Sequence, residues 1–224
     1  SIAIAGYRAQ LQYILWFFIL IRLMNTRGDF MAFYYVLTAV AALMCLHCIY
    51  QYIVATPIPS TWVSQTEMSV RTRVFSITGS PNIMGAIIVM TAPLAAGLLY
   101  KWKNPKLKFI ALCTVGIMLL SVLFTFSRGA WVGMIVAVLV FALLVDRKLI
   151  AMMGVAMAAI LMFVPSITNR ITYLFTEDFV NASTAGGRMV RWETGMELLK
   201  SSNSALGYGL GRFGGAVAMQ NQTD

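Results

Sequence analysis

The fold of this chain is decided by one apolar stretch, Leu107–Val145, which reads LKFIALCTVGIMLLSVLFTFSRGAWVGMIVAVLVFALLV. A single helix of this length would extend about 58 Å at 1.5 Å per residue, whereas the hydrocarbon core of a bilayer is about 30 Å thick. The chain therefore has to turn back once within the stretch. The triplet Ser127-Arg128-Gly129 is the polar interruption at which it can do so, which predicts two antiparallel membrane helices joined there.

Similar apolar runs precede and follow this pair, and each is long enough, or nearly so, to cross a bilayer. The predicted spans are Leu11–Leu23, Met31–Val54, Asn82–Tyr100, Leu107–Phe126, Ala130–Val145 and Leu149–Val164. We therefore expect an all-α, polytopic membrane protein with about six transmembrane helices in residues 1–164. Residues 165–224 are expected to form a long extracytoplasmic loop with an amphipathic helix, and the chain reads as an internal fragment of a larger protein.

The composition excludes a soluble domain. Hydrophobic residues make up 59% of the chain and charged residues 11%, whereas soluble domains carry about 25% charged residues. The formal net charge of +9 comes from 17 Lys and Arg against 8 Asp and Glu. These basic residues form no continuous patch on a soluble surface, so we do not expect nucleic acid as a partner. We expect membrane lipid as a partner instead.

Orientation follows from the basic residues. The loop Lys101–Lys108 carries four lysines, which the positive-inside rule places in the cytoplasm. Alternation then puts residues 146–148 on the same side, and Arg73, Arg128 and the tail on the extracytoplasmic side. Arginines there run against the rule, and the planar guanidinium suits bidentate binding of phosphate or carboxylate. We therefore expect the outer face to bind an anion.

Two short motifs on the outer face are candidates for this anion site. Arg73 precedes Ser80-Pro81-Asn82, in which Ser80 can cap a helix and Pro81 suits its first turn. The free N–H groups of a helix start attract negative charge; the alternative is a capped helix with interfacial arginines. Arg128 at the tight turn is either a fixed cation at the mouth of the bundle or a membrane anchor.

The tail holds a third candidate. Gly187–Lys200 has apolar residues at helical spacing, and Arg188 and Arg191 project from one face of that helix. The alternative is a helix that lies on the membrane with its arginines at the headgroups. The glycine-rich run 207–215 either lets the backbone approach a ligand closely or forms a flexible turn. It lacks the flanking strand and helix of a dinucleotide fingerprint.

Neither a metal ligand nor a cofactor is expected among the site residues. Cys45, His47 and Cys48 lie together within a predicted span and offer no fourth ligand, so small buried side chains fit better. His47 is the only histidine, and we expect it to make a helix-packing hydrogen bond. The outer carboxylates form no paired motif near the arginines.

The outer motifs, in their order along the chain, resemble the superfamily of O-antigen ligases and O-antigen polymerases, which are bacterial membrane glycosyltransferases. Residues before Arg71 match only as membrane helices. The matching residues are Arg73–Ser76, Gly79–Asn82, Gly85, Pro93-Leu94, Phe126–Trp131, Gly187-Arg188, Trp192 and Leu206–Gly214.

The resemblance implies a metal-independent glycosyltransferase in the bacterial cytoplasmic membrane, with its active face extracytoplasmic. A glycan would pass from a polyprenyl-pyrophosphate carrier to a hydroxyl of a glycan or lipid acceptor. The family pattern gives catalytic roles to Arg128 and Arg188. From their side and spacing we add as substrate-binding residues Arg73, Asn82, Arg191, Gly207, Gly209 and Arg212.

The resemblance does not assign a general base. Many members of the family carry a histidine late in the outer loop that is proposed to activate the acceptor, and no residue after Gly215 matches it. A lipid-linked glycan transporter or flippase, or a membrane scaffold of polysaccharide export, would also be basic and helical. Transporters, however, usually place charges near the membrane midplane, whereas the predicted spans hold almost none.

Overall fold

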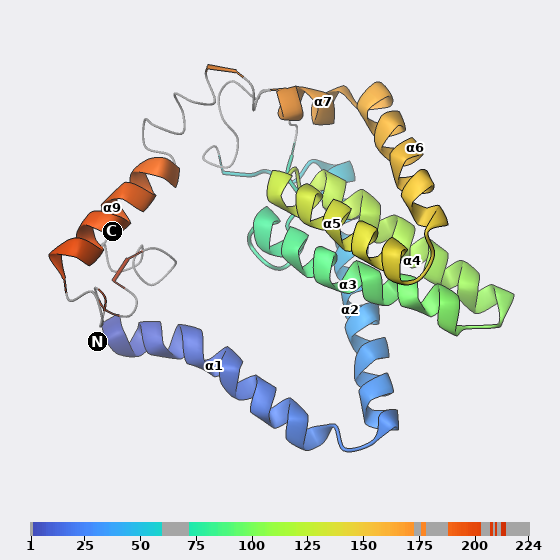
Figure 1. Cartoon of the computed structure of the whole chain (residues 1–224), viewed down its shortest axis with the longest axis horizontal. Coiled ribbons are helices and arrows are strands. Elements are labelled where there is room, and N and C mark those ends of the chain that lie inside the picture. The colour runs from blue at the N-terminus through green and yellow to red at the C-terminus, as the bar shows by residue number, and fades with distance from the viewer. Residues whose placement is uncertain are drawn as a thin grey trace. The chain divides into compact units, whose positions relative to one another are not determined.

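The computed structural model describes residues 2–59, 72–172, 176–177, 188–202, 207, 209 and 212–213. These described residues form helices and no strand, which confirms the all-α fold (Figure 1). Each predicted span corresponds to one helix. Six residues of the matching motifs lie outside the described residues: Gly187, Leu206, Tyr208, Leu210, Gly211 and Gly214. The helices are α1 (Ile2–Leu23), α2 (Arg27–Val54), α3 (Pro81–Lys101), α4 (Pro105–Phe124), α5 (Arg128–Leu144), α6 (Lys148–Phe163), α7 (Pro165–Thr172) and α9 (Arg188–Ser201).

The number of membrane crossings is confirmed in part. By length and composition, α1 to α4 can cross a bilayer, with 22, 28, 21 and 20 residues. Helix α5 has 17 residues and α6 has 16. At 1.5 Å per residue they extend about 26 Å and about 24 Å, which is shorter than a bilayer core of about 30 Å. Four of about six predicted crossings are thus supported, and those of α5 and α6 stay predictions.

The chain divides into two compact units, which are described separately below. Met31–Phe175 forms the bundle unit, which contains most of α2 and all of α3 to α7. Ser1–Phe30 and Thr176–Asp224 form the terminal unit, which contains α1 and α9. The predicted boundary between membrane bundle and outer loop after residue 164 stays a prediction.

The helix starts follow from local sequence. Thr26 and Asp29 form a capping box before α2: the Thr26 N–H donates to Asp29 Oδ2 at 2.9 Å, and the Asp29 N–H donates to Thr26 Oγ1 at 3.1 Å. Asn104 Oδ1 accepts from the Lys106 N–H at 2.9 Å, and Pro105 occupies the first turn of α4. Between α4 and α5 the chain turns back at residues 125–127, so only Ser127 of the predicted turn Ser127-Arg128-Gly129 lies in it, and Arg128 and Gly129 already belong to α5.

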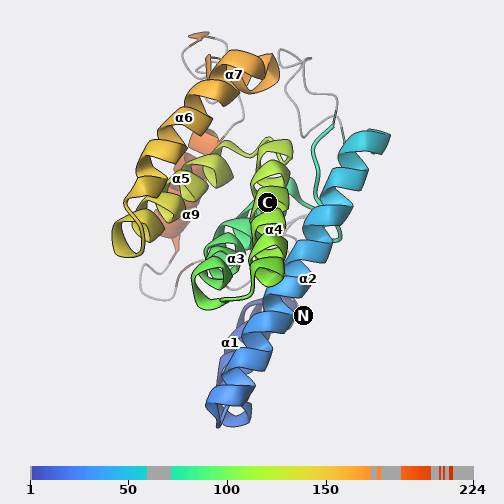
Figure 2. The same cartoon turned by 90° about the vertical axis from the view of Figure 1, so that its right-hand side faces the viewer.

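Helices α3, α4 and α5 lie side by side in the bundle unit, with α2 on one side of the α3–α4 pair and α5 and α6 on the other (Figure 2). A Cβ at Gly85 of α3 would lie only 2.5 Å from the Cβ of Ala130 of α5, and a Cβ at Gly133 would lie 3.5 Å from Val89. Because both sequence numbers rise together at these contacts, α3 and α5 run parallel. Their N-termini therefore lie at the same end of the bundle unit.

Helix α2 runs antiparallel to α3. Near its start the Tyr34 hydroxyl donates to the Leu94 carbonyl, and Lys101 Nζ lies 5.0 Å from the centre of the Tyr35 ring. Near its end Tyr52 stacks on Phe124 with ring centroids 3.8 Å apart. One end of the unit, the Lys101 end, thus carries the lysine-rich connection. The opposite end, where α3 and α5 begin, is the Arg128 end; the membrane face of each end stays a prediction.

Candidate functional site

Arg128 is the first residue of α5, directly after the N-cap residue Ser127. It is half-buried, and its Nε atom is buried. The turn before it is tightly held. Phe126 has a φ of 48°, a left-handed value that is uncommon for a bulky residue, and the Ser127 N–H donates to Thr125 Oγ1 at 3.2 Å. The backbone that carries Arg128 is therefore fixed by its neighbours.

A second helix start lies beside Arg128. Helix α3 begins at Pro81, with Ser80 at the N-cap in an extended conformation. Within the described residues, neither Ser80 nor Ser127 makes a side-chain capping bond. The first-turn N–H groups of both helices are thus left uncapped by these serines, and each helix start carries a partial positive charge. Asn82, in the first turn of α3, is exposed.

Arg73 belongs to this end but is packed inside, with 8% of its surface exposed. Its Nε donates to the Thr125 carbonyl at 3.0 Å, and its Nη2 donates to Asn82 Oδ1 at 3.4 Å. The structure thus brings together three of the predicted site positions, Arg73, Asn82 and the turn of Arg128. Asn82 and Arg128 reach the surface, whereas Arg73 lies behind them.

Gln51 is an organising residue that the sequence analysis missed. Its side chain, 5% exposed, accepts from the backbone N–H groups of Phe75 at 3.0 Å and Ser76 at 2.8 Å. It also donates to the Ser76 carbonyl at 3.2 Å. His47 Nδ1 lies 3.1 Å from Ser76 Oγ, so this histidine contacts the turn before α3 and not, as the sequence analysis expected, a neighbouring helix. The available signal was an amide side chain in an otherwise apolar span.

Cys45 and Cys48 are fully buried, which confirms that they are packing side chains. Ser121 Oγ donates to the Cys45 carbonyl at 3.0 Å and joins α4 to α2. In the part of the chain that the structure describes, no group of three or more His, Cys, Asp or Glu residues is arranged to hold a metal ion.

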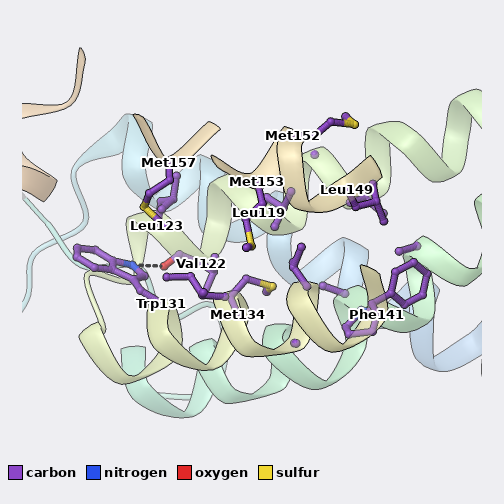
Figure 3. Close-up of a pocket in the computed structure, with 18 of the residues that line it drawn as sticks. Leu119, Val122, Leu123, Trp131, Met134, Phe141, Leu149, Met152, Met153 and Met157 are labelled. Atoms are coloured by element: carbon purple, nitrogen blue, oxygen red, sulfur yellow. Dashed lines mark hydrogen bonds between the residues drawn. The ribbon is translucent and has the colours of Figure 1, made fainter. Parts of the chain in front are cut away.

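An apolar cavity of about 440 Å³ lies within the bundle unit (Figure 3). Trp131 and Met157 line one end of it, and Phe141 and Leu149 line the other. The Trp131 Nε1–H donates to the Val122 carbonyl at 3.0 Å, so the polar atom of this ring has a partner. Because Trp131 lies three residues after Arg128, the cavity begins about one helical turn below that arginine.

This cavity opens toward the side of the bundle unit. Two of its lining residues also face outward, since Leu112 is 57% exposed and Met152 is 65% exposed. In a membrane this surface contacts lipid chains. We therefore expect that an apolar chain can enter the cavity from the bilayer without crossing water.

The other candidate arginines lie in the terminal unit. Helix α9 confirms the predicted helix over Gly187–Lys200, with Arg188 as its first residue and Arg191 exposed; the side chain of Arg188 lies outside the described residues. A Cβ at Gly195 would lie 3.0 Å from Phe213. Because positions 188, 191 and 195 share one stripe of the helix, Phe213 packs on the stripe that carries both arginines, at a position one turn beyond Arg191.

The glycine-rich run has left-handed backbone at both of its described glycines. Gly207 has a φ of 72° and Gly209 a φ of 112°, values that favour glycine over other residues. The Arg212 N–H donates to the Gly209 carbonyl at 3.4 Å, and Arg212 is exposed. This turn therefore presents Arg212 next to the residue that packs on α9.

Long apolar helices, an arginine at a helix start and an apolar cavity one turn below it define a multi-pass membrane protein with a cationic site at one end of its bundle. The family model described as O-antigen ligase matches residues 113–223, which include Arg128 and Arg188. This match supports the assignment of the chain to the O-antigen ligase superfamily. Its members are membrane glycosyltransferases of the ligase or polymerase type that act on lipid-linked glycan donors and acceptors. No curated protein and no solved structure matches the chain.

Proposed function

We propose that this protein transfers a glycan from a polyprenyl-pyrophosphate carrier to a hydroxyl group of a glycan or lipid acceptor. The reaction would take place at the extracytoplasmic face of a bacterial cytoplasmic membrane. One observation carries the proposal: Arg128 stands at the start of α5, beside the start of α3 and one turn above an apolar cavity. A lipid pyrophosphate matches this arrangement in two parts: its dianionic head suits the arginine at the helix start, and its hydrocarbon chain suits the apolar cavity.

The reaction requires stabilisation of a leaving group. The acceptor oxygen attacks the anomeric carbon, the bond from that carbon to the pyrophosphate oxygen breaks, and the electron pair leaves with the pyrophosphate. The acceptor proton passes to a base that stays unassigned. Negative charge grows on the leaving oxygen, and a well-placed fixed donor lowers the barrier by roughly 3–4 kcal/mol. We assign this role to Arg128 and Arg188, which makes a divalent metal unnecessary.

The remaining site residues other than Arg73 are assigned to binding. Asn82 and the uncapped starts of α3 and α5 provide neutral donors and helix dipoles for the phosphate oxygens. Arg191 and Arg212 add cations from the terminal unit. The left-handed turn at Gly207 and Gly209 lets its backbone approach the sugar. The cavity takes the first isoprene units of the carrier, because its lining is apolar and it opens toward lipid.

The proposal is tested with purified full-length protein in lipid nanodiscs. A polyprenyl-pyrophosphate-linked oligosaccharide and an acceptor glycan are added, and released polyprenyl pyrophosphate is measured together with the elongated acceptor. We expect equal amounts of both products. In proteoliposomes, movement of the intact lipid-linked glycan between leaflets without release of pyrophosphate would instead identify a transporter. If neither transfer nor movement occurs, a scaffold function is favoured.

A further inference from the structure

The last carbonyl groups of α4 have unusual partners. A helix leaves its final carbonyls without intrahelical donors, and α4 ends at Phe124. The Phe124 carbonyl accepts from the Val74 N–H at 3.1 Å, and the Thr125 carbonyl accepts from Arg73 Nε at 3.0 Å. The end of α4, which leads directly to Arg128, is thus capped by a segment about fifty residues earlier in the chain.

That segment, residues 72–76, is itself anchored to α2. The Gln51 side chain binds the backbone N–H groups of Phe75 and Ser76 and the carbonyl of Ser76. The Thr72 hydroxyl donates to the Thr56 carbonyl at 2.8 Å just beyond the end of α2. Thr72 is fully buried. The segment therefore has a fixed position on α2. The end of α4, which this segment caps, is held in place relative to α2 as well.

Arg73 is the residue of this segment that reaches two further elements. Its Nε holds the α4–α5 turn, and its Nη2 reaches Asn82 in the first turn of α3 at 3.4 Å. Arg73 thus links the start of α5, where Arg128 stands, to the start of α3. With 8% of its surface exposed, Arg73 is far less accessible to a ligand than the half-buried Arg128.

We propose that Arg73 is a positioning residue that fixes the start of α5, and so Arg128, relative to the start of α3. This inference rests on the proposed function for its effect on turnover, but its structural content is independent of it. Guanidinium suits the task because its donors point in fixed, different directions, whereas a lysine ammonium is a single point charge. Displacement of a catalytic group by about 1 Å can cost about a hundredfold in rate.

The structural part is tested by pulsed electron paramagnetic resonance on the full-length protein. Spin labels are placed at Ile83→Cys and Gly129→Cys, in the first turns of α3 and α5, on a Cys113→Ala background that removes the exposed thiol. Ile83 is 54% exposed, and a Cβ at Gly129 meets no atom within 4 Å. We expect a narrow distance distribution that broadens in Arg73→Gln and is unchanged in the control Arg147→Gln, an exposed arginine at the Lys101 end. An unchanged distribution in Arg73→Gln overturns the proposal.

The kinetic part is a double-mutant cycle with Arg128→Ala. Alone, Arg73→Gln should lower kcat by about tenfold to a hundredfold and change KM for the donor by less than about threefold. In the Arg128→Ala background its further effect should be below about threefold, because coupled residues are not additive. If the effects of Arg73→Gln and Arg128→Ala on kcat multiply in the double variant, Arg73 acts independently of Arg128 and the proposal is contradicted. A raised KM with normal kcat in Arg73→Gln would show that Arg73 contacts the donor itself and would also contradict it.

Two safeguards keep the outcomes distinct. If Arg73→Gln does not accumulate, Arg73→Lys retains the buried charge but loses the second arm, and the same broadening and the same non-additivity are expected at smaller size. Normal spacing and normal turnover in Arg73→Lys would overturn the proposal. If the wild-type protein transfers no glycan, the proposed function fails, while the resonance experiment still decides whether Arg73 fixes the two helix starts.

Discussion

At the scale of single residues, Arg73 and Arg128 show how two arginines at one end of a membrane bundle acquire different tasks. Arg73 is buried and its side chain binds protein atoms, Thr125 and Asn82. Arg128 lies half-buried at a helix start above the cavity. The first arrangement holds the backbone in place, and we propose that the second presents charge to the donor pyrophosphate.

Replacement by lysine separates charge from geometry at the catalytic positions. We expect Arg128→Lys and Arg188→Lys each to lower turnover about tenfold to a thousandfold, which corresponds to roughly 1.4–4 kcal/mol of transition-state stabilisation. The reason is that lysine keeps the charge but lacks the bidentate fork. Release of polyprenyl pyrophosphate and protein abundance are measured, with Arg147→Lys as the matched control. An interfacial anchor would accept lysine, so wild-type turnover in both variants would refute the arginine mechanism.

The same mechanism predicts that activity survives removal of divalent metals. The fixed guanidinium groups of Arg128 and Arg188 would do electrostatically what a bound cation does in many transferases. Transfer is measured before and after exhaustive treatment with EDTA, and again after magnesium is restored. We expect the rate of transfer to change by less than about twofold. Removal of a catalytic metal would instead cost several kcal/mol of transition-state stabilisation. Loss of activity that magnesium restores would contradict the arginine mechanism without affecting the fold.

At the scale of elements, the close approach of α3 and α5 is the most demanding contact. A Cβ at Gly85 would lie 2.5 Å from the Cβ of Ala130, so Gly85→Ala must push the two helix starts apart. We expect a destabilisation of about 1–3 kcal/mol, typical of overpacking, seen as a lower thermal midpoint in detergent. Gly133→Ala, whose Cβ would lie 3.5 Å from Val89, is the control and should be tolerated. Ala130→Gly should rescue Gly85→Ala.

Sequence reasoning could predict the elements but not their cross-links. Apolar length and the positions of Pro81, Pro105 and Ser127 determine local structure, and α2 to α6 begin within four residues of the predicted starts. Helix α1 begins at Ile2, nine residues before the predicted start at Leu11. By contrast, the burial of Arg73 depends on a carbonyl at residue 125. Helix α7 was likewise not foreseen: its eight residues are too short and too polar to show a span, and it is Ile167 that packs into the core. Such contacts depend on where distant segments meet, which periodicity does not encode.

The cavity gives a prediction at the same scale. Gly116 lines it, and a Cβ there meets no atom within 4 Å, so Gly116→Phe should occupy the cavity without displacing a neighbour. If the cavity takes the isoprene chain, KM for the lipid-linked donor should rise about tenfold with kcat nearly unchanged, because uniform binding is lost. Gly154→Phe on α6 is the matched control, since its site is equally open and lies outside the cavity. Equal KM values for the two variants would place the chain elsewhere.

At the scale of the whole molecule, everything proposed for the site depends on which side of the membrane the Arg128 end faces. The lysine-rich connection at the opposite end, Lys101–Lys108, predicts that this end is cytoplasmic. Ile77, 78% exposed, and Asn104, also exposed, mark the Arg128 end and the Lys101 end. On a Cys113→Ala background, the two remaining cysteines, Cys45 and Cys48, are fully buried and should not react.

A membrane-impermeant maleimide added to intact cells should therefore modify Ile77→Cys, and it should modify Asn104→Cys only after the membrane is opened. The ratio of labelling before and after permeabilisation is the measured quantity. The reverse pattern would place the arginines in the cytoplasm, where the positive-inside rule alone explains them. Arg128 would then need no ligand to account for its position, and a glycan carrier presented outside could not reach it. The fold and the contacts of Arg73 would stand, but the proposed transfer reaction would not.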